Sequence, residues 1–235
     1  MTGLGTIINV GGILLGGLMG LLFGRFLTER FQTMLVRAIA VCVMIIGVEG
    51  AVEKMLTAVS GGGTLMLICS MVLGGLIGEL LDIDRRVVRF GEWLKAKTGS
   101  ARDAGFVEGF VTTSLTVSIG AMAIVGAIND AIFGDYSVLT AKAILDFLFV
   151  LVLTASLGKG CMFSAIPVAL LQGLVTVLAR LIRPLLTDAA LANLGLVGSV
   201  LIFCVGLNSI RKDTVKVANL LPAIVIAAAF AFLPV

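Results

Sequence analysis

The chain has 235 residues, of which 59% are apolar and only 13% charged, and its mean hydropathy is +1.16. A soluble domain is on average about half apolar and a quarter charged, so this composition excludes an ordinary soluble globule and favours a membrane protein. The net charge of +3 does not suggest nucleic-acid binding, and the absence of histidine removes the commonest metal ligand and the base of Ser-His and Cys-His catalysis. We therefore expect no nucleic-acid partner, no metal, no cofactor and no enzyme activity.

Eight apolar segments follow one another along the chain, and each is close to the roughly 20 residues that a helix needs to cross the hydrocarbon layer. They cover residues 4–23, 36–52, 64–81, 110–128, 139–157, 161–181, 191–207 and 215–232. The sequence thus predicts an all-α, polytopic transmembrane helical bundle of about eight spans, with residues 1–235 forming a single transmembrane domain. Because the start does not resemble a cleavable signal peptide, we expect the first segment to remain as a membrane anchor.

The positive charges predict the orientation of these spans. With both termini outside, all but four of the 17 Lys and Arg residues lie on the cytoplasmic side, as the positive-inside rule requires. The four exceptions are Lys54, Lys142, Arg180 and Arg183. Without the fourth span, the cluster of Arg211, Lys212 and Lys216 would instead lie outside. We therefore expect a multi-pass plasma-membrane protein whose N- and C-termini are both outside.

Glycines recur every four residues in the first and third segments. The first segment carries such a series and the third repeats it more briefly: Gly12, Gly16, Gly20 and Gly24, then Gly74 and Gly78. In lipid, faces of small residues let helix backbones approach closely. We predict that these glycines pack against other helices, either within the protomer or in a homo-oligomer. A glycine-lined pathway is the alternative.

Two internal matches suggest a duplication. Residues 14–22 (LLGGLMGLL) match residues 72–80 (VLGGLIGEL), and residues 41–49 match residues 200–208 weakly, which aligns Gly47 with Gly206. The weaker match relates two spans that cross in opposite directions. It predicts an inverted repeat of three spans, the first to third against the sixth to eighth, as in many transporters. Chance similarity between apolar segments is the alternative.

The longest polar stretch, residues 82–104, is expected to be a basic amphipathic loop on the cytoplasmic side. Its apolar residues recur at helical spacing around Trp93, with several Lys and Arg residues between them: Ile83, Val87, Phe90 and Leu94. This pattern favours a short helix in the anionic headgroup region of the inner leaflet. A solvated loop with a helical start is the alternative.

Polar residues inside the apolar segments are the candidate functional residues, because each ionisable one costs a few kcal/mol near the bilayer centre. Asp146 follows Lys142 by one helical turn, so the two can pair on one face. Other candidates are a carboxylate in the second segment, hydroxyls in the fourth and an amide in the seventh. Together they predict a path for a solute or ion lined by Glu49, Thr112, Thr116, Ser118, Asp146 and Asn208. Structural pairing of the carboxylates is the alternative.

Several short motifs in combination resemble one protein family. They are Gly5-Thr-Ile-Ile-Asn-Val, Leu15-Gly-Gly-Leu-Met-Gly, Leu27-Thr-Glu-Arg, Leu73-Gly-Gly-Leu-Ile-Gly-Glu-Leu-Leu, Gly120-Ala-Met-Ala-Ile-Val-Gly-Ala-Ile, Gly134-Asp-Tyr-Ser and Val217-Ala-Asn-Leu-Leu-Pro-Ala. Over nearly its whole length the chain is similar to the YqgA/YdfK family of bacterial membrane proteins, although Thr28 stands where that family often has proline. The resemblance implies a protein of the bacterial inner membrane with a domain of unknown function, so it transfers no catalytic residue.

These features predict a small transporter or channel for an ion or a small polar solute, embedded in the lipid bilayer as a homo-oligomer. No phosphate-binding loop of the form G-x-x-x-x-G-K-S/T occurs, so ATP-driven pumping by this chain alone is not expected. A non-catalytic membrane scaffold or assembly partner is the alternative. An intramembrane enzyme is less favoured because the sequence offers no obvious pair of nucleophile and base.

Overall fold

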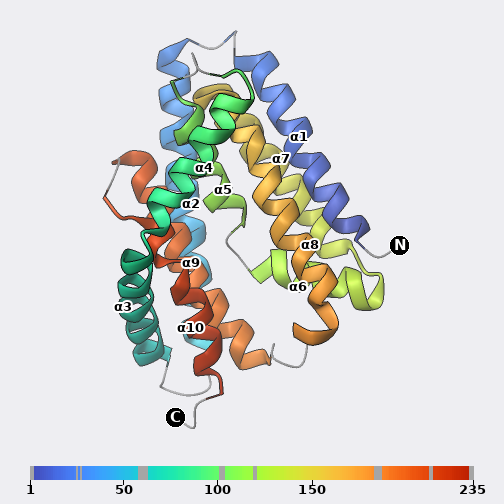
Figure 1. The fold of residues 1–235 in the computed structure, drawn as a ribbon, viewed down its shortest axis with the longest axis vertical. Coiled ribbons are helices and arrows are strands. Elements are labelled where there is room, and N and C mark those ends of the chain that lie inside the picture. Colours follow the sequence, from blue (N-terminus) through green and yellow to red (C-terminus); the bar gives the residue numbers. More distant parts are fainter. Residues whose placement is uncertain are drawn as a thin grey trace. The chain divides into compact units, whose positions relative to one another are not determined.

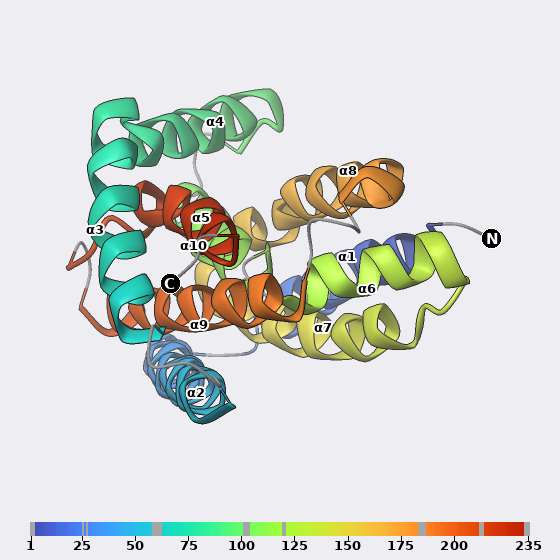
Figure 2. The same ribbon diagram turned by 90° about the horizontal axis from the view of Figure 1, so that it is seen from below.

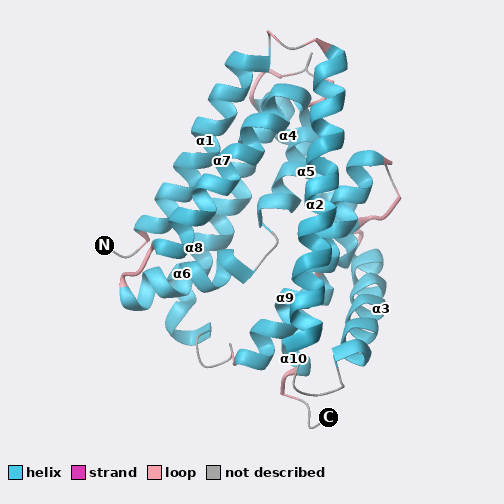
Figure 3. Cartoon of the chain, turned by 180° about the vertical axis from the view of Figure 1, so that it is seen from behind, coloured by secondary structure: helices cyan, strands magenta, loops and turns pink. Residues whose placement is uncertain are grey.

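The computed structural model describes residues 3–24, 26, 28–57, 63–100, 104–118, 121–182, 187–211 and 214–232. Within these ranges the chain forms helices, turns and loops, and no strand occurs (Figure 3). The helices are α1 (Leu4–Gly24), α2 (Glu29–Thr57), α3 (Gly63–Leu81), α4 (Ile83–Lys97), α5 (Phe106–Ser118), α6 (Ala121–Phe133), α7 (Ser137–Leu157), α8 (Ala165–Ile182), α9 (Asp188–Ile210) and α10 (Pro222–Phe230), with the 3-10 helices η1 (Lys159–Ser164) and η3 (Val217–Leu220). The predicted all-α fold is confirmed.

Five helical segments in the described part of the chain are long and apolar enough to cross a membrane. They are α1, α3, α7, α9 and the continuous segment Lys159–Ala179, which consists of η1 and most of α8. A sixth crossing results if α5 and α6, which are bent by 74° relative to each other, are taken as one broken span. The second predicted span lies within α2, and the eighth, residues 215–232, contains the short apolar segment Val217–Phe230. A polytopic helical protein is therefore confirmed, and the number of eight spans stays a prediction.

The chain, expected to be a single transmembrane domain, contains two compact units. The first comprises Met1–Ile39, Val88–Ser118 and Met122–Arg180, and the second comprises Ala40–Val87, Ile119–Ala121 and Leu181–Val235. Helices α1, α5 and α7 thus belong to the first unit together with most of α4, α6 and α8. Helices α3, α9 and α10 belong to the second unit with most of α2.

In the first unit, α1 and α7 run side by side in the same direction (Figure 1) and meet at the predicted glycines. A methyl group added at Gly12 would lie 2.8 Å from the carbonyl oxygen of Ala143, and one at Gly24 would lie 2.9 Å from that of Ala155. Methyl groups added at Gly16 and Gly20 would likewise contact the carbonyl oxygens of Phe147 and Leu151, so the contacts recur every four residues along both helices. This glycine face is therefore occupied within the protomer, so a homo-oligomer would have to use other surfaces.

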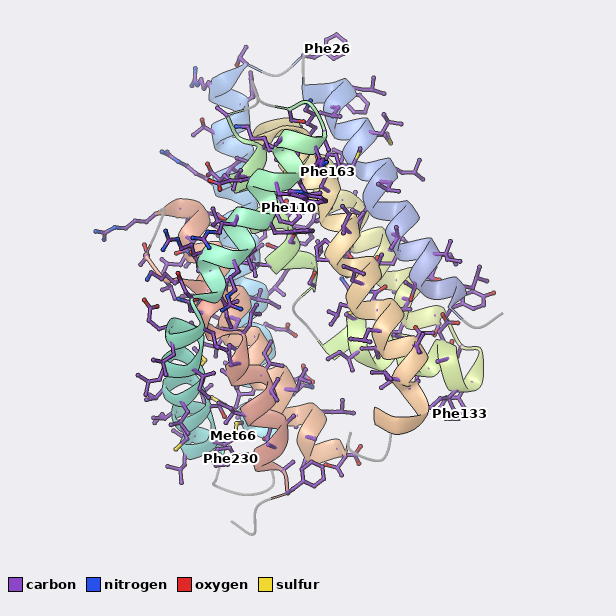
Figure 4. The ribbon with its side chains drawn as sticks, in the orientation of Figure 1. Phe26, Met66, Phe110, Phe133, Phe163 and Phe230 are labelled. Carbon is purple, nitrogen blue, oxygen red and sulfur yellow. The ribbon has the colours of Figure 1, made fainter. Side chains whose placement is uncertain are left out.

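In the second unit, α3 runs antiparallel to η3 and α10. Gly74 lies against the backbone of Ala223 and Gly78 against that of Asn219, so these two glycines also pack within the chain. Figure 4 labels Met66 near the start of α3 and Phe230 at the end of α10, and both lie at the same end of this unit, as antiparallel packing requires.

Helices α2 and α9 also pack antiparallel through glycines, and α9 lies beside α10 (Figure 2). A methyl group at Gly47 would lie 2.6 Å from the nitrogen of Phe203, and one at Gly206 would lie 2.8 Å from the carbonyl oxygen of Ala40. The two glycines aligned by the weaker internal match thus lie at one helix crossing. This contact agrees with the predicted inverted repeat, which otherwise stays a prediction.

A polar network ties the end of α3 to the start of α4 and to η3. Lys216 lies 2.7 Å from one carboxylate oxygen of Glu79, and the Asn219 amide donates to the other at 2.6 Å. The Asn219 side-chain oxygen accepts a hydrogen bond of 2.7 Å from the backbone N–H of Asp84, near the start of α4. The hydrogen bond with Glu79 raises the pKa of the Lys216 ammonium group. Asn219 of the closing sequence motif therefore has a structural role, because it joins three elements.

Candidate functional site

A buried ion pair on α7 is the main charged feature of the first unit. The Lys142 ammonium group lies 2.8 and 2.7 Å from the two carboxylate oxygens of Asp146. The two side chains are only 10% and 6% exposed. The spacing of four residues brings them together on one helix face, as predicted from the sequence. Neither charge is stable alone in such a place, because removing one partner of a buried pair typically costs about 3–5 kcal/mol.

Lys142 also makes a third contact, with the end of α5. Its ammonium group donates a buried hydrogen bond of 2.8 Å to the carbonyl oxygen of Val117. Val117 is the last residue but one of α5, where carbonyl groups lack intrahelical donors and the helix end carries a partial negative charge. Lys142 therefore caps α5 at the point where the fourth predicted segment is interrupted. This fourth segment was predicted over residues 110–128, and in the structure it is divided between α5 and α6.

Two further buried polar side chains belong to the same unit. Asp130 of α6 is fully buried, and one of its carboxylate oxygens accepts a hydrogen bond of 2.9 Å from the backbone N–H of Gly5, at the positive N-terminal end of α1. Asn9, one turn further along α1, is also fully buried. Neither amide atom of Asn9 makes a hydrogen bond of good geometry. Helices α1, α5, α6 and α7 thus all contribute polar groups to the interior of this unit.

Many other polar atoms in this interior lack hydrogen bonds. Within the described residues, the buried side-chain nitrogen and oxygen atoms that have no hydrogen bond of good geometry all lie in the first unit. They belong to Thr6, Asn9, Thr113, Ser114, Ser118, Asp130, Thr154, Ser156, Ser164, Gln172 and Thr176. We call these residues the unsatisfied polar set. An unsatisfied buried polar group costs about 1–3 kcal/mol, so these atoms are suited to bind water or a polar solute.

The hydroxyl groups of this set differ from other helical hydroxyls of the chain. A Ser or Thr in a helix can donate to the carbonyl oxygen one turn back. In the second unit, Ser199 and Ser209 do so, with distances of 2.8 Å to Gly195 and 3.0 Å to Val205. The hydroxyl of Ser114 makes no such bond. Its lack of a partner is therefore a property of its position and not of its residue type.

The unsatisfied polar set extends along most of α1. At the start of this helix, a methyl group added at Gly3 would lie 3.9 Å from the Thr176 side chain, and one turn before its end Gly20 lies against Thr154. Asn9 lies between these two levels. With its 21 residues, α1 is roughly 30 Å long, which is about the thickness of the hydrocarbon layer. The unsatisfied atoms are therefore distributed over the depth of a membrane.

The structure places four of the predicted path residues in the first unit. Asp146 is in the ion pair, and Ser118, at the end of α5, belongs to the unsatisfied polar set. Thr116 instead donates to the carbonyl oxygen of Thr112 at 2.8 Å, and both threonines are half-buried. The hydroxyl of Thr116 is thus satisfied by its own helix, whereas Thr113 and Ser114, which the prediction omitted, are not.

The other two predicted path residues lie in the second unit. The Asn208 amide closes the turn after α9, because it donates to the carbonyl oxygen of Val215 at 2.6 Å and accepts from the Val215 N–H at 3.0 Å. Its polar atoms are therefore engaged in local structure. The Glu49 side chain is exposed on α2. Their predicted part in a path has no support in the contacts described for them.

The structure also reveals three polar residues that the sequence analysis did not propose for the path. Asn9 could have been found, because it and Thr6 are the two polar side chains in the first apolar segment. Gln172 is likewise a polar side chain inside an apolar segment, the sixth, and in the structure it is fully buried with both amide atoms unsatisfied. Asp130 lies just beyond the fourth predicted segment, residues 110–128, and only the fold shows that it caps α1. Within the described residues, no group of three or more Cys, Asp or Glu side chains is arranged to hold a metal ion.

Comparison with known proteins identifies relatives of the chain over nearly its full length. A family model described as "Protein of unknown function (DUF554)" matches residues 4–232. The chain is 27% identical over 228 residues to the uncharacterized protein YqgA of Escherichia coli (strain K12), which covers 95% of this chain and 94% of YqgA. It is 25% identical over 222 residues to the uncharacterized membrane protein YdfK of Bacillus subtilis (strain 168), with 94% and 93% covered. No solved structure matches significantly. The resemblance noted in the sequence is thus confirmed, and the chain belongs to the DUF554 family of membrane proteins of unknown function.

Proposed function

We propose that this protein is a transporter or channel that moves an ion or a small polar solute across the bacterial inner membrane. One observation carries the proposal: the unsatisfied polar set lies in the same unit as a buried ion pair and extends along most of a membrane-spanning helix. In a dry bundle each of these atoms would lower stability by about 1–3 kcal/mol. Water and a passing solute remove this cost, so the pattern is the one expected for a hydrated route.

The broken fourth span supports this proposal. In many transporters, half-helices end inside the protein and bind the solute or the coupling ion at their polar ends. Here the end of α5 is held by Lys142 through the Val117 carbonyl group, and the same ammonium group binds Asp146. A cationic group of a solute can compete with Lys142 for these oxygen atoms, and an anionic group can compete with Asp146. Displacement of Lys142 from the Val117 carbonyl group would release α5 from α7.

We infer from the directions of packed helices that the chain crosses the membrane eight times. Parallel α1 and α7 require an odd number of crossings between them, which α2, α3 and the α5–α6 pair supply. Antiparallel α3 and α10 require an even number, supplied by the α5–α6 pair, α7, α8 and α9. The antiparallel pair of α2 and α9 gives the same result. If the α5–α6 pair entered and left on one side, each of these directions would reverse. With the charge distribution, eight crossings predict that both termini lie outside.

Site-directed labelling tests this topology on either side of the α5–α6 pair. Ala96→Cys, in α4, and Asp135→Cys, before α7, both replace exposed residues. In a background where Cys42, Cys69, Cys161 and Cys204 are replaced by alanine, we expect an impermeant maleimide to label position 135 from outside the cell. Position 96 should react only after the membrane is opened. Labelling of both positions from the same side would show that α5 and α6 do not cross.

The proposed activity is tested by reconstituting the purified protein in liposomes and measuring the flux of a panel of ions and polar metabolites. We expect flux above that of empty vesicles for at least one solute. Ser114→Ala should lower this flux by about 2- to 10-fold, the equivalent of one hydrogen bond of about 0.5–1.5 kcal/mol. Ser209→Ala is the matched control, because it removes a hydroxyl that its own helix satisfies. Absence of flux over the whole panel, or equal effects of the two substitutions, would contradict the proposal.

A further inference from the structure

Helix α4 begins where a membrane-spanning helix ends. The span α3 ends at Leu81, and the single residue Asp82 separates it from α4. Asp82 has a φ of 48°, in the left-handed region, so the chain does not continue the α3 helix and a new helix axis begins. Because the one charged residue of α3, Glu79, lies in its last turn and the rest of the helix is apolar, α4 starts at the surface of the membrane.

One face of α4 combines aromatic and basic residues. These residues are spaced by three, four, seven and eleven positions from the first, which places them on one side of a helix, and each is exposed: Arg86, Arg89, Phe90, Trp93 and Lys97. We call this face the aromatic-basic stripe. The two acidic residues of the helix, Asp84 and Glu92, lie off it. The neighbouring side of α4 is packed, because Gly91 and Leu94 are buried and Gly91 lies against the Phe110 ring of α5.

The aromatic residues of the stripe are held in place at the surface. The rings of Phe90 and Trp93 are stacked, with their centroids 5.7 Å apart and an interplanar angle of 17°. Phe90 also contacts Phe110, with a centroid distance of 5.8 Å. Even so, Phe90 and Trp93 remain 39% and 52% exposed. An exposed, fixed aromatic pair among cationic side chains is typical of helices in the lipid headgroup region, where aromatic rings are buried at the acyl boundary and Arg binds phosphate.

We propose that the aromatic-basic stripe docks α4 onto anionic phospholipid headgroups at the membrane face where α3 ends. The stripe carries three cations and no acid, so it complements a negatively charged lipid surface. Its rings supply the apolar contact that a purely electrostatic association lacks. The connection to α3 keeps α4 beside that surface, which favours lipid over a soluble partner. This inference does not depend on the proposed transport function.

The fluorescence of Trp93 provides a direct test, because it is the single tryptophan of the chain. The full-length protein is placed in nanodiscs of phosphatidylcholine, or of phosphatidylcholine with phosphatidylglycerol, that contain lipids brominated near the headgroup end of the acyl chain. We expect stronger quenching and a blue-shifted emission with phosphatidylglycerol. High salt should reduce this difference, because it screens surface charges.

Paired substitutions identify the residues responsible. The double variant Arg86→Gln, Arg89→Gln should lose most of the phosphatidylglycerol-dependent quenching. The matched double variant Arg30→Gln, Arg37→Gln removes two exposed arginines from α2 and should retain it. Equal quenching in the two lipid mixtures would overturn the proposal. So would free access of aqueous acrylamide to Trp93 in the anionic nanodiscs, the result expected if the stripe served a soluble acidic protein instead.

Discussion

The single substitution Asp146→Leu is expected to destabilise the protein by about 3–5 kcal/mol, because it leaves the Lys142 ammonium group buried without its carboxylate. Lys142 would keep only its hydrogen bond to Val117. Lys142→Met should have an effect of similar size, since it leaves the carboxylate unpaired. Denaturant or thermal unfolding in detergent micelles measures both losses.

The double variant Lys142→Met, Asp146→Leu separates a structural role of this pair from a functional one. Replacing both charges with apolar side chains of similar size is often neutral or stabilising, so we expect the double variant to recover most of the lost stability. The recovery should be incomplete because the Val117 carbonyl group loses its donor. If the pair binds the solute, this stable double variant should nevertheless show no flux in liposomes. A stable double variant with wild-type flux would show that the pair only holds α5 and α7 together.

Gly16→Ala should destabilise the first unit by about 1–3 kcal/mol, since the added methyl group would overlap the backbone of Phe147 in α7. A backbone in a packed helix cannot move aside as a flexible side chain can. Gly11→Ala is the matched control, because a methyl group there meets no atom within 4 Å. It should be neutral or slightly stabilising, since alanine is the better helix former. Equal changes in the melting temperatures of the two variants would show that the contact between α1 and α7 does not limit stability.

The sequence predicts the features of this fold that depend on neighbouring residues along one helix. Apolar length predicts the membrane helices, and a spacing of four predicts the Lys142–Asp146 pair and the glycine face of α1. Helical periodicity likewise predicts α4. In each case the residues concerned are separated by one or two helical turns, so their spacing in the sequence is enough to place them on one face of a helix.

Features that depend on contacts between distant segments could not be predicted in this way. Hydropathy shows that a residue avoids water, but it does not show whether lipid or another helix covers it. The approach of Asp130 to the start of α1 joins residues 125 positions apart. The capping of α5 by Lys142 requires the packing of two helices, and the local sequence around Val117 shows only hydroxyls and a nearby glycine. For the same reason, the sequence does not show that the Asn208 amide is engaged by Val215 in the turn after α9.

The parallel contact of α1 and α7 has a consequence for biosynthesis. Helix α1 is synthesised first, but its packing partner α7 ends at Leu157, which is synthesised far later. Until α7 has been inserted, the glycine face of α1 contacts acyl chains instead of the α7 carbonyl groups. The contact between α1 and α7 can therefore form only after roughly two-thirds of the chain has been translated, so the glycine face of α1 is among the last surfaces of its half of the chain to find its partner.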